Sequence, residues 1–254
     1  MSNPVLGLQL YTVRDVLAQD FEGTVREVSE MGYDAVELTG TGPFDGAGLK
    51  TFLDELGLDA AGMHVGLDIL ESDLAGSIEL AKALDLATLV CPYLPDERRG
   101  GRDDWLNIAQ ILDQMGEECR RQGVKLSYHN HSFEFVEFEG QYALDLLYEN
   151  TSSENVSSEL DTYWIQHGGG DPVEYVEKYG ERTVILHLKD MADDEERSFT
   201  EVGNGILDWE GIYGAATAAG IQYYCVEQDT CPGDPLESAR KSAEYLKSEF
   251  GLGS

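Results

Sequence analysis

The sequence predicts a (β/α)8 barrel, the TIM barrel fold, and two regularities of the chain support this prediction. Short apolar runs rich in Val, Ile, Leu and Tyr alternate with longer segments that have the periodicity of amphipathic helices. Eight such alternations fit into 254 residues, a typical length for a barrel of this kind. A doubly wound open sheet is the alternative, but no GxGxxG motif follows the first predicted strand.

The predicted strands are short apolar runs, and each is followed by a predicted helix. The strands are Val5–Leu10, Ala35–Leu38, Asp59–His64, Thr88–Cys91, Lys125–Asn130, Ser157–Asp161, Val184–Leu188 and Tyr223–Glu227. The helices are Phe21–Met31, Ala47–Leu56, Leu74–Leu84, Trp105–Gln122, Tyr142–Glu149, Pro172–Tyr179, Trp209–Ala219 and Leu236–Phe250. Because no Pro/Ser-rich linker and no internal repeat interrupts this alternation, we expect a single domain over residues 1–254.

Residues that favour helix ends mark several of these boundaries. Asp20 is placed to cap the first helix, and Gly32 follows the end of that helix. Asp171 and Pro172 supply an N-cap and a first-turn proline for the sixth helix, and Asp208 is placed to cap the seventh. Glycines stand between a helix and the next strand at four places: Gly57, Gly123, Gly180 and Gly220.

The chain is strongly acidic. It holds 17 Lys and Arg against 49 Asp and Glu, which gives a formal net charge of −32, and the acidic residues are spread along its length. Since 42 % of the residues are hydrophobic, the chain has enough apolar material for a core and is not a disordered acidic tail. Self-repulsion destabilises such a protein unless salt screens it, so we interpret the composition as halophilic. An ordinary acidic enzyme is the alternative.

Charge and hydropathy also exclude classes of partner. An acidic surface repels phosphates, so we expect no binding of nucleic acid. No apolar run approaches the roughly 18 residues of a membrane span, and no basic-then-apolar signal segment begins the chain. We therefore expect a soluble, cytoplasmic protein that does not bind membranes.

Ionisable residues stand at the carboxyl ends of four consecutive predicted strands. His129, Asp161 and His187 lie at the ends of the fifth, sixth and seventh strands, and Glu227 ends the eighth. Because the carboxyl ends of barrel strands converge on one pocket, we expect these side chains to meet there. A single strand-end His or Asp is more often a hydrogen-bonded or capping residue. Four on four consecutive strands favour a site for a divalent metal such as Mn, Co or Zn.

Several stretches resemble the xylose-isomerase-like superfamily of TIM barrel enzymes, over essentially the whole chain. The stretches are Gly7–Arg14, Glu37–Gly40, Gly62–His64, Glu159–Val173, Val184–Asp190 and Glu201–Trp209. The resemblance implies one divalent metal ion (Mn, Co, Mg or Zn) held by a Glu, an Asp, a His and a Glu from strands five to eight. Asp161, His187 and Glu227 match the last three positions. His129 stands where many relatives carry the first Glu, so we expect it to be the fourth ligand, with Glu134 as the alternative.

The resemblance further implies a sugar or sugar phosphate isomerase or epimerase that acts on a polyhydroxy ketone or aldehyde through a metal-held enediolate. We expect Glu227 to be the base, with Lys189 or Glu134 as the acid. Pairing of Lys189 with Asp190 or Glu159 is the structural alternative for this lysine. Four residues are expected to line the pocket or bind the substrate: Glu37, His64, His131 and Trp164.

The histidine on strand five leaves a second activity open. Epimerases of this superfamily use two ligand glutamates on opposite faces of the substrate, and a metal-bound neutral His129 has no free lone pair for that role. A lyase similar to inosose dehydratases is therefore the alternative. Endonuclease-IV-like DNA repair would need further metal ligands and a basic groove, and a non-catalytic sugar-binding barrel would not need the metal ligands. A homo-oligomer stays open, and three arginines after strand four are candidates for a phosphate site: Arg98, Arg99 and Arg102.

The halophilic interpretation predicts that stability rises with salt. The midpoint temperature of unfolding should increase substantially between dilute buffer and KCl at about 1 M, because the Debye length shrinks to about 3 Å and repulsion among the acidic residues fades. Circular dichroism melts measure the midpoint, and sucrose at matched osmolality is the control because it does not screen charge. Equal midpoints in dilute buffer and in molar KCl would contradict the interpretation.

Overall fold

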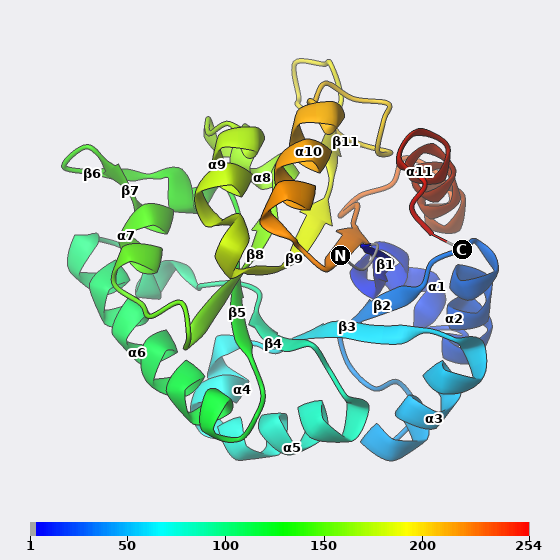
Figure 1. The fold of residues 1–254 in the computed structure, drawn as a ribbon, viewed down its shortest axis with the longest axis horizontal. Coiled ribbons are helices and arrows are strands. Elements are labelled where there is room, and N and C mark those ends of the chain that lie inside the picture. Colours follow the sequence, from blue (N-terminus) through cyan, green and yellow to red (C-terminus); the bar gives the residue numbers. More distant parts are fainter. Residues whose placement is uncertain (1–3, 254) are drawn as a thin grey trace.

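Eight parallel strands close into a barrel in the computed structural model, which describes residues 4–253 (Figure 1). The strands are β1 (Val5–Gln9), β2 (Ala35–Leu38), β3 (Asp59–His64), β4 (Thr88–Cys91), β5 (Leu126–His129), β8 (Val156–Asp161), β9 (Thr183–Leu188) and β12 (Tyr223–Val226). Their order is β1-β12-β9-β8-β5-β4-β3-β2, so the first and last strands pair and close the sheet. The predicted TIM barrel is confirmed, and each predicted strand is found with its ends shifted by at most one residue.

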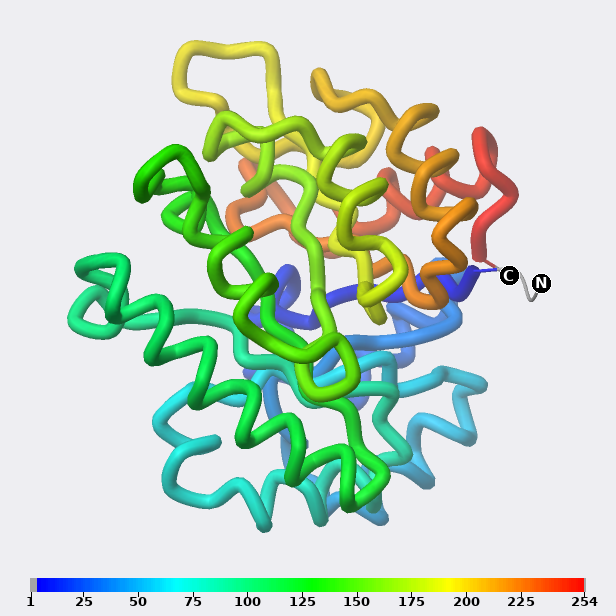
Figure 2. Tube along the Cα trace, turned by 60° about the vertical axis from the view of Figure 1, so that its left-hand side comes forward, coloured from blue at the N-terminus to red at the C-terminus, as the bar shows by residue number. Residues whose placement is uncertain are grey.

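Helices cover the outside of the barrel (Figure 2). Those predicted from the sequence are α2 (Phe21–Glu30), α3 (Gly46–Leu56), α5 (Leu74–Leu84), α6 (Arg102–Arg121), α7 (Ala143–Glu149), α9 (Pro172–Tyr179), α10 (Trp209–Ala219) and α11 (Pro235–Phe250). The predicted N-caps Asp20, Asp171 and Asp208 are confirmed. The largest shift is in α6, which begins three residues early because Asp104 accepts the N–H of Gly101 and extends the first turn. Within the described residues, no helix is both long and apolar enough to cross a membrane.

Short elements that the sequence did not predict gather mainly after the carboxyl ends of the barrel strands. Most are helical turns of three to seven residues, which are too short to show a helical period. These are η1 (Leu10–Val13), α1 (Arg14–Leu17), α4 (Leu67–Ser72), η2 (Asp96–Arg98), η3 (Phe133–Phe135), α8 (Thr162–Gly168) and η4 (Gly180–Arg182). The others are two hairpins, β6 (Glu137–Phe138) with β7 (Gln141–Tyr142), and β10 (Asp190–Met191) with β11 (Phe199–Thr200).

The inward face of the barrel changes from apolar to ionisable along each of several strands. A small apolar cluster inside the barrel includes Ala35, Ile185 and Cys225, which lie on β2, β9 and β12. Because side chains alternate across a strand, the residue two positions later faces the same side. That residue is ionisable on all three strands: Glu37 after Ala35, His187 after Ile185 and Glu227 after Cys225. The interior of the barrel thus has an apolar floor, and above it lies a layer of ionisable side chains near the carboxyl ends of the strands.

Asp190 holds the segment that follows β9. Its Oδ1 accepts the N–H groups of Met191 and Leu207, and its Oδ2 accepts those of Gly203 and Gly205, at 2.8–3.3 Å. The indole N–H of Trp209 is a fifth donor, 2.7 Å from Oδ2. A Cβ at residue 205 would lie 2.2 Å from this carboxylate, so the position requires glycine. One buried side chain therefore fixes the course of the segment that carries Phe199 to the barrel rim (Figure 2, yellow).

Replacing Asp190 with alanine should destabilise the protein strongly. The substitution leaves five donors without their acceptor, and unsatisfied buried donors cost about 1–3 kcal/mol each before water enters. We expect the free energy of unfolding to fall by about 2–4 kcal/mol in denaturant titrations. Asp208→Ala is the matched control, because it removes only an exposed N-cap and should cost about 1 kcal/mol. Equal losses for the two variants would contradict the role assigned to Asp190.

Candidate metal centre and active site

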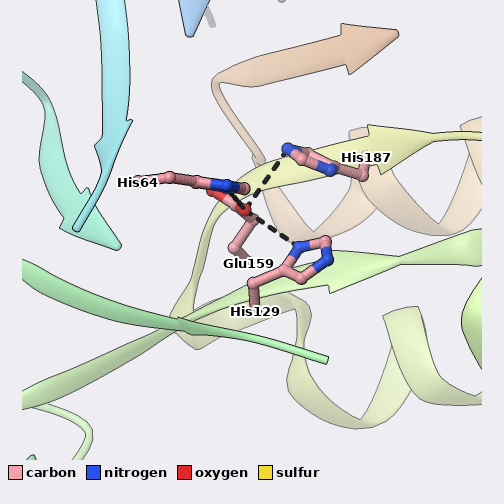
Figure 3. Close-up of side chains that lie close together, drawn as sticks. All are labelled: His64, His129, Glu159 and His187. Carbon is pink, nitrogen blue, oxygen red and sulfur yellow. Dashed lines mark hydrogen bonds and ion pairs between the residues drawn. The ribbon is translucent and has the colours of Figure 1, made fainter. Parts of the chain in front are cut away.

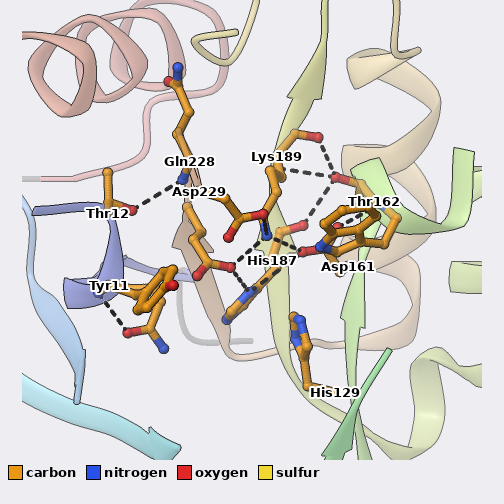
Figure 4. Close-up of polar contacts among 12 residues, drawn as sticks. Tyr11, Thr12, His129, Asp161, Thr162, His187, Lys189, Gln228 and Asp229 are labelled. Carbon is orange, nitrogen blue, oxygen red and sulfur yellow. Dashed lines mark hydrogen bonds and ion pairs between the residues drawn. The ribbon is translucent and has the colours of Figure 1, made fainter. Parts of the chain in front are cut away.

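The four predicted metal ligands meet at the carboxyl end of the barrel. His129 ends β5, Asp161 ends β8, His187 lies in β9 and Glu227 follows β12. All four side chains are buried, and they offer ligand atoms that lie within 4.8 Å of one another. Figure 4 shows His129, Asp161 and His187 reaching one point from three neighbouring strands. The convergence expected from barrel geometry brings these residues together.

The donor set of this group fits a divalent metal ion. Nδ1 of His187 lies 3.0 Å from Oε2 of Glu227 and 3.8 Å from Oδ2 of Asp161. Asp161 is held in place by its Oδ1, which accepts the N–H of Trp164 at the start of α8. Its Oδ2 is buried and, among residues 4–253, accepts no well-directed hydrogen bond, although the Lys189 ammonium lies 3.0 Å away. A buried carboxylate oxygen that accepts no well-directed hydrogen bond can bind a metal cation. A donor set of two imidazoles and two carboxylates suits Zn, Mn or Co.

Two carboxylates, Glu37 and Glu159, lie beneath the candidate ligands and face their imidazole rings. Figure 3 shows Glu159 between the rings of His64, His129 and His187. Oε2 of Glu37 lies 2.6 Å from Nε2 of His187. Oε1 of Glu159 lies 3.0 Å from Nδ1 of His129, 2.8 Å from Nε2 of His64 and 3.3 Å from Nε2 of His187. Because one nitrogen of each candidate ligand histidine faces a carboxylate, the other nitrogen would be available to a metal ion, and the ring orientation is fixed.

These two glutamates depart from the prediction in different ways. Glu37 was expected to line the pocket, but it is fully buried below the ligands and contacts His187 and His64 instead. The sequence suggested Glu159 only as an alternative partner of Lys189. In the structure it contacts three histidines instead. The signal that could have identified it is its position two residues before Asp161 on the same strand, which places it on the same inward face.

Burial and charge set the protonation of this layer. Burial raises the pKa of Glu159 to about 8, and the nearby Glu37 adds to the rise. Burial would lower the pKa of His64, but the charges of Glu37 and Glu159 outweigh it and raise this pKa to about 10. Burial lowers the pKa of His129 well below its usual range, so its imidazole is neutral, which is the form that binds a metal.

Lys189 lies beside the candidate metal ligands and not beside Asp190 or Glu159, its predicted alternative partners. Its Nζ is 2.7 Å from Oε2 of Glu227, 3.0 Å from Oδ2 of Asp161 and 3.1 Å from Oδ2 of Asp229 (Figure 4). The alternative pairing with Asp190 or Glu159 is therefore wrong. Burial would lower the pKa of Lys189, but Asp161 and Glu227 outweigh it and raise this pKa well above its usual value. The side chain is an ammonium group with three carboxylates around it.

The same charges act on Glu227 and Asp229. Burial would raise the pKa of Glu227, but the Lys189 ammonium and the hydrogen bond with His187 outweigh it and hold this pKa well below its usual range. Burial raises the pKa of Asp229 to about 6. Asp229 was not assigned a role from the sequence, although it stands two residues after Glu227 and so faces the same side.

Glu134 lies away from the cluster. Its Oε1 accepts the hydroxyl of Tyr128 at 2.6 Å, and its Oε2 accepts the N–H of His131 at 2.8 Å. The side chain is fully buried, and burial raises its pKa to about 8. Both oxygens are thus used to hold the end of β5 and the turn after it. The structure does not bring Glu134 to the place that an acid or a fourth metal ligand would need.

A cavity of about 540 Å³ opens above the cluster. It is lined by Tyr11, Thr39, His64, Pro92, Tyr93, His129, His131, Trp164, Phe199, Glu227 and Asp229. The predicted positions of His64, His131 and Trp164 at the pocket are thus found in the structure, whereas Glu37 and Glu134 lie outside this lining. Burial lowers the pKa of His131 to about 4, so its ring is neutral.

Comparisons with known proteins match nearly the whole chain. A sequence model of the xylose isomerase-like TIM barrel family matches residues 25–249. An inosose dehydratase from Lacticaseibacillus casei is 26 % identical over 271 aligned residues, which cover 91 % of this chain and 90 % of that protein. A sugar phosphate isomerase/epimerase structure from Parabacteroides distasonis superposes with a TM-score of 0.85 at 27 % identity, covering 99 % of this chain and 96 % of that one. The IolI protein, solved with a zinc atom, shares the fold with a TM-score of 0.78 at 14 % identity, covering 98 % of this chain and all of that one.

Two histidines at the end of β5 allow a matched test of the ligand assignment. His129→Gln should weaken Zn²⁺ or Mn²⁺ binding more than the roughly 10–100-fold loss typical of an outer-shell change, because it removes a proposed ligand. His131→Gln should leave metal affinity within a few-fold of wild type, since His131 belongs to the cavity wall and not to the ligand group. Competition with a chromophoric chelator measures both affinities. Unchanged affinity in His129→Gln would remove His129 from the ligand set.

Proposed function

Because the chain belongs to the xylose isomerase-like TIM barrel family, we propose that it is a metal-dependent enzyme that dehydrates a polyhydroxy ketone. The observation that carries the proposal is the contact between Glu227, which lines the cavity, and Lys189, which is buried beside the candidate metal ligands with its Nζ 2.7 Å from Oε2 of Glu227. A divalent cation held by His129, Asp161, His187 and Glu227 would polarise the substrate carbonyl and a neighbouring hydroxyl. The remaining chemistry is proton transfer by side chains of this chain.

Glu227 is the proposed base. Its carboxylate lines the cavity beside the candidate metal ligands, so it is placed to accept the proton from the carbon next to the carbonyl. Lys189 is the proposed acid, because its ammonium group contacts Glu227 and Asp229, the two carboxylates of the cavity lining. It protonates the departing hydroxyl, which leaves as water. The short contact between the two groups then lets Glu227 return its proton to Lys189.

The residue on strand five favours dehydration over two-face epimerisation. His129 stands at the strand-five position where many relatives carry a second glutamate, and its Nδ1 faces Glu159, which would leave its other nitrogen for the metal. Among the described residues, the carboxylates that line the cavity are Glu227 and Asp229, and both contact Lys189. Removal and return of a proton from opposite faces of the substrate would need a base at the place of His129.

Isomerisation on one face is the second candidate. The Glu227–Lys189 pair could return the proton to the neighbouring carbon from the side on which it was removed. The sequence resemblance favours isomerisation or epimerisation over dehydration. The similar structure from Parabacteroides distasonis is that of a sugar phosphate isomerase/epimerase. The preference for dehydration rests on the strand-five histidine and on the likeness to inosose dehydratases over most of both chains.

A keto-inositol supplied in D2O separates these activities. Dehydration gives loss of water and a conjugated enone that absorbs in the ultraviolet. Isomerisation keeps the mass of the substrate apart from incorporated deuterium and moves the carbonyl. Proton NMR and mass spectrometry of the same reaction distinguish the two products, and an absence of both with keto-inositols and with linear ketoses would contradict the proposed function.

Glu227→Gln should reduce turnover by at least the ~10²–10⁴-fold typical of a lost general base. The substitution keeps the shape of the side chain and one ligand oxygen, so substrate binding should stay largely intact. Metal content is measured in the same sample, because a variant without metal would not report on the base. The second readout is exchange of the carbon-bound hydrogen with solvent deuterium. Exchange at the wild-type rate in the fully metallated variant would make Glu227 a ligand only.

A further inference from the structure

A second pocket, of about 630 Å³, lies at the amino-terminal end of the barrel, and we call it the amino-end pocket. Its lining includes Lys125, Ser157, Thr183 and Gln222, which stand at or next to the first residues of β5, β8, β9 and β12. The candidate metal ligands lie toward the opposite ends of the same four strands. Since a strand rises about 3.3 Å per residue, the four residues from Lys125 to His129 span about 13 Å. The amino-end pocket is therefore separate from the cavity over the candidate metal ligands.

Three cationic side chains line the amino-end pocket. Arg120 lies in the last turn of α6, Lys125 directly precedes β5, and Arg182 lies in η4, directly before β9. Among residues 4–253, none of the three forms an ion pair with a carboxylate. Glu154 and Glu181 line the same pocket, and neither of them pairs with these cations. The positive charges of the pocket thus have no counter-ion within the described chain.

Many of the N–H groups on these cations have no acceptor. Nε of Arg120 donates to Oδ1 of Asn155 at 3.1 Å, and both of its Nη groups have no partner among the described residues. The ammonium group of Lys125 has none either. Arg182 is held in the wall by hydrogen bonds of 2.5–3.2 Å to three acceptors: the carbonyl oxygens of Tyr148 and Val156 and the hydroxyl of Thr151. Its charge is fixed in place, while those of Arg120 and Lys125 offer free donors.

Elsewhere in this acidic chain, cations readily find carboxylates. The three arginines after β4, which the sequence suggests as candidates for a phosphate site, are all paired: Arg98 with Glu71, Arg99 with Asp96 and Arg102 with Glu139. None of the three lines the cavity over the candidate metal ligands. Further cations that pair with no carboxylate, Arg14, Lys82 and Arg197, lie on separate parts of the chain. Three such cations around one pocket, in a chain of net charge −32, indicate a site for an anion.

We propose that the amino-end pocket binds a phosphate group, either as the free ion or as a small phosphate monoester. This site is independent of the proposed function. The guanidinium of Arg120 matches two phosphate oxygens in a fork geometry, and Lys125 adds a compact point charge. The hydroxyls of Ser153 and Ser157, which have no partner among residues 4–253, supply further donors. A carboxylate, with two oxygens and one charge, would leave more of these donors unused.

A bound phosphate would also stabilise the fold. Arg120, Lys125 and Arg182 come from three segments of the chain, and their like charges repel one another when no anion lies between them. An anion held by all three connects α6 to the starts of β5 and β9. Because the unfolded chain has no such pocket, binding raises the stability of the folded state. The midpoint temperature of unfolding should therefore rise with phosphate concentration.

The test uses inorganic phosphate and glycerol 3-phosphate as probes of the metal-loaded protein. Isothermal titration is run at constant ionic strength, with KCl exchanged for the probe, at the lowest ionic strength that keeps the protein folded. The wild type should show saturable binding, and Arg120→Gln with Lys125→Gln should weaken it at least about ten-fold, because charge-assisted hydrogen bonds are lost. Phosphate bound to the metal ion would persist in this variant, so the difference between the proteins reports on the amino-end pocket alone.

The matched control is Arg121→Gln with Lys50→Gln. It makes the same change in net charge, but both residues are paired on the outer helices and neither lines the pocket. Its affinity for the probes should stay within about two-fold of wild type. Lys125→Gln alone is a second variant, and since this lysine has no partner to lose, its fold should be unaffected. Circular dichroism melts with and without phosphate are the second readout.

The two probes distinguish the source of the phosphate. Tighter binding of glycerol 3-phosphate would identify a phosphorylated small molecule, and tighter binding of inorganic phosphate would identify the free ion; both results support the site. Three results would overturn it: no saturable binding of either probe, binding that Arg120→Gln with Lys125→Gln leaves unchanged, or equal losses in this variant and in the charge-matched control.

Discussion

The structure depends on the need to pair ionisable groups inside a barrel that excludes water. His187 shows the constraint most clearly, because Nε2 faces Glu37 at 2.6 Å and Nδ1 faces Glu227 at 3.0 Å. Both carboxylates need charged or hydrogen-bonding partners to be buried: Glu37 also contacts His64, and Glu227 also contacts Lys189. His187 is the partner that the two carboxylates share, and together they fix the orientation of its ring. The apolar floor formed by Ala35, Ile185 and Cys225 lies directly below, so the polar layer is bounded by residues that offer no alternative partner. The geometry of the whole site follows from this alternation of carboxylate and imidazole.

Much of this arrangement could be predicted from the sequence because it follows from strand geometry. The strands end on ionisable residues, and parallel strands in a barrel converge, which is sufficient to bring His129, Asp161, His187 and Glu227 together. The helices with long periodic patterns and N-cap aspartates were placed within a few residues for the same local reasons.

The depth of each side chain and the course of the loops could not be predicted in this way. Alternation says that Glu37 and Glu159 face inward, but not that they lie below the ligands, because depth depends on the stagger between neighbouring strands. Glu134 is one residue in a short turn. Its hydrogen bonds to Tyr128 and to the backbone of His131 depend on the tertiary fold, which the periodicity of the sequence does not indicate. Lys189 has several acidic neighbours in sequence, and only the packing of three strands selects Asp161, Glu227 and Asp229.

The anchoring of the segment after β9 has a consequence for how this protein can diversify. Asp190 fixes both ends of the segment. The stretch between Ala192 and Ser198 makes no contact with that carboxylate and is held instead at its far end by Arg197, which donates to the backbone carbonyls of Gln166 and His167 in α8. Insertions or sequence changes at this tip would leave the barrel and the ligand geometry intact, whereas Phe199, at the edge of the anchored part, contributes to the cavity wall. Different parts of the chain therefore determine the geometry of the candidate metal ligands and the shape of the cavity wall. Substitutions can change the cavity wall while the ligand geometry is preserved.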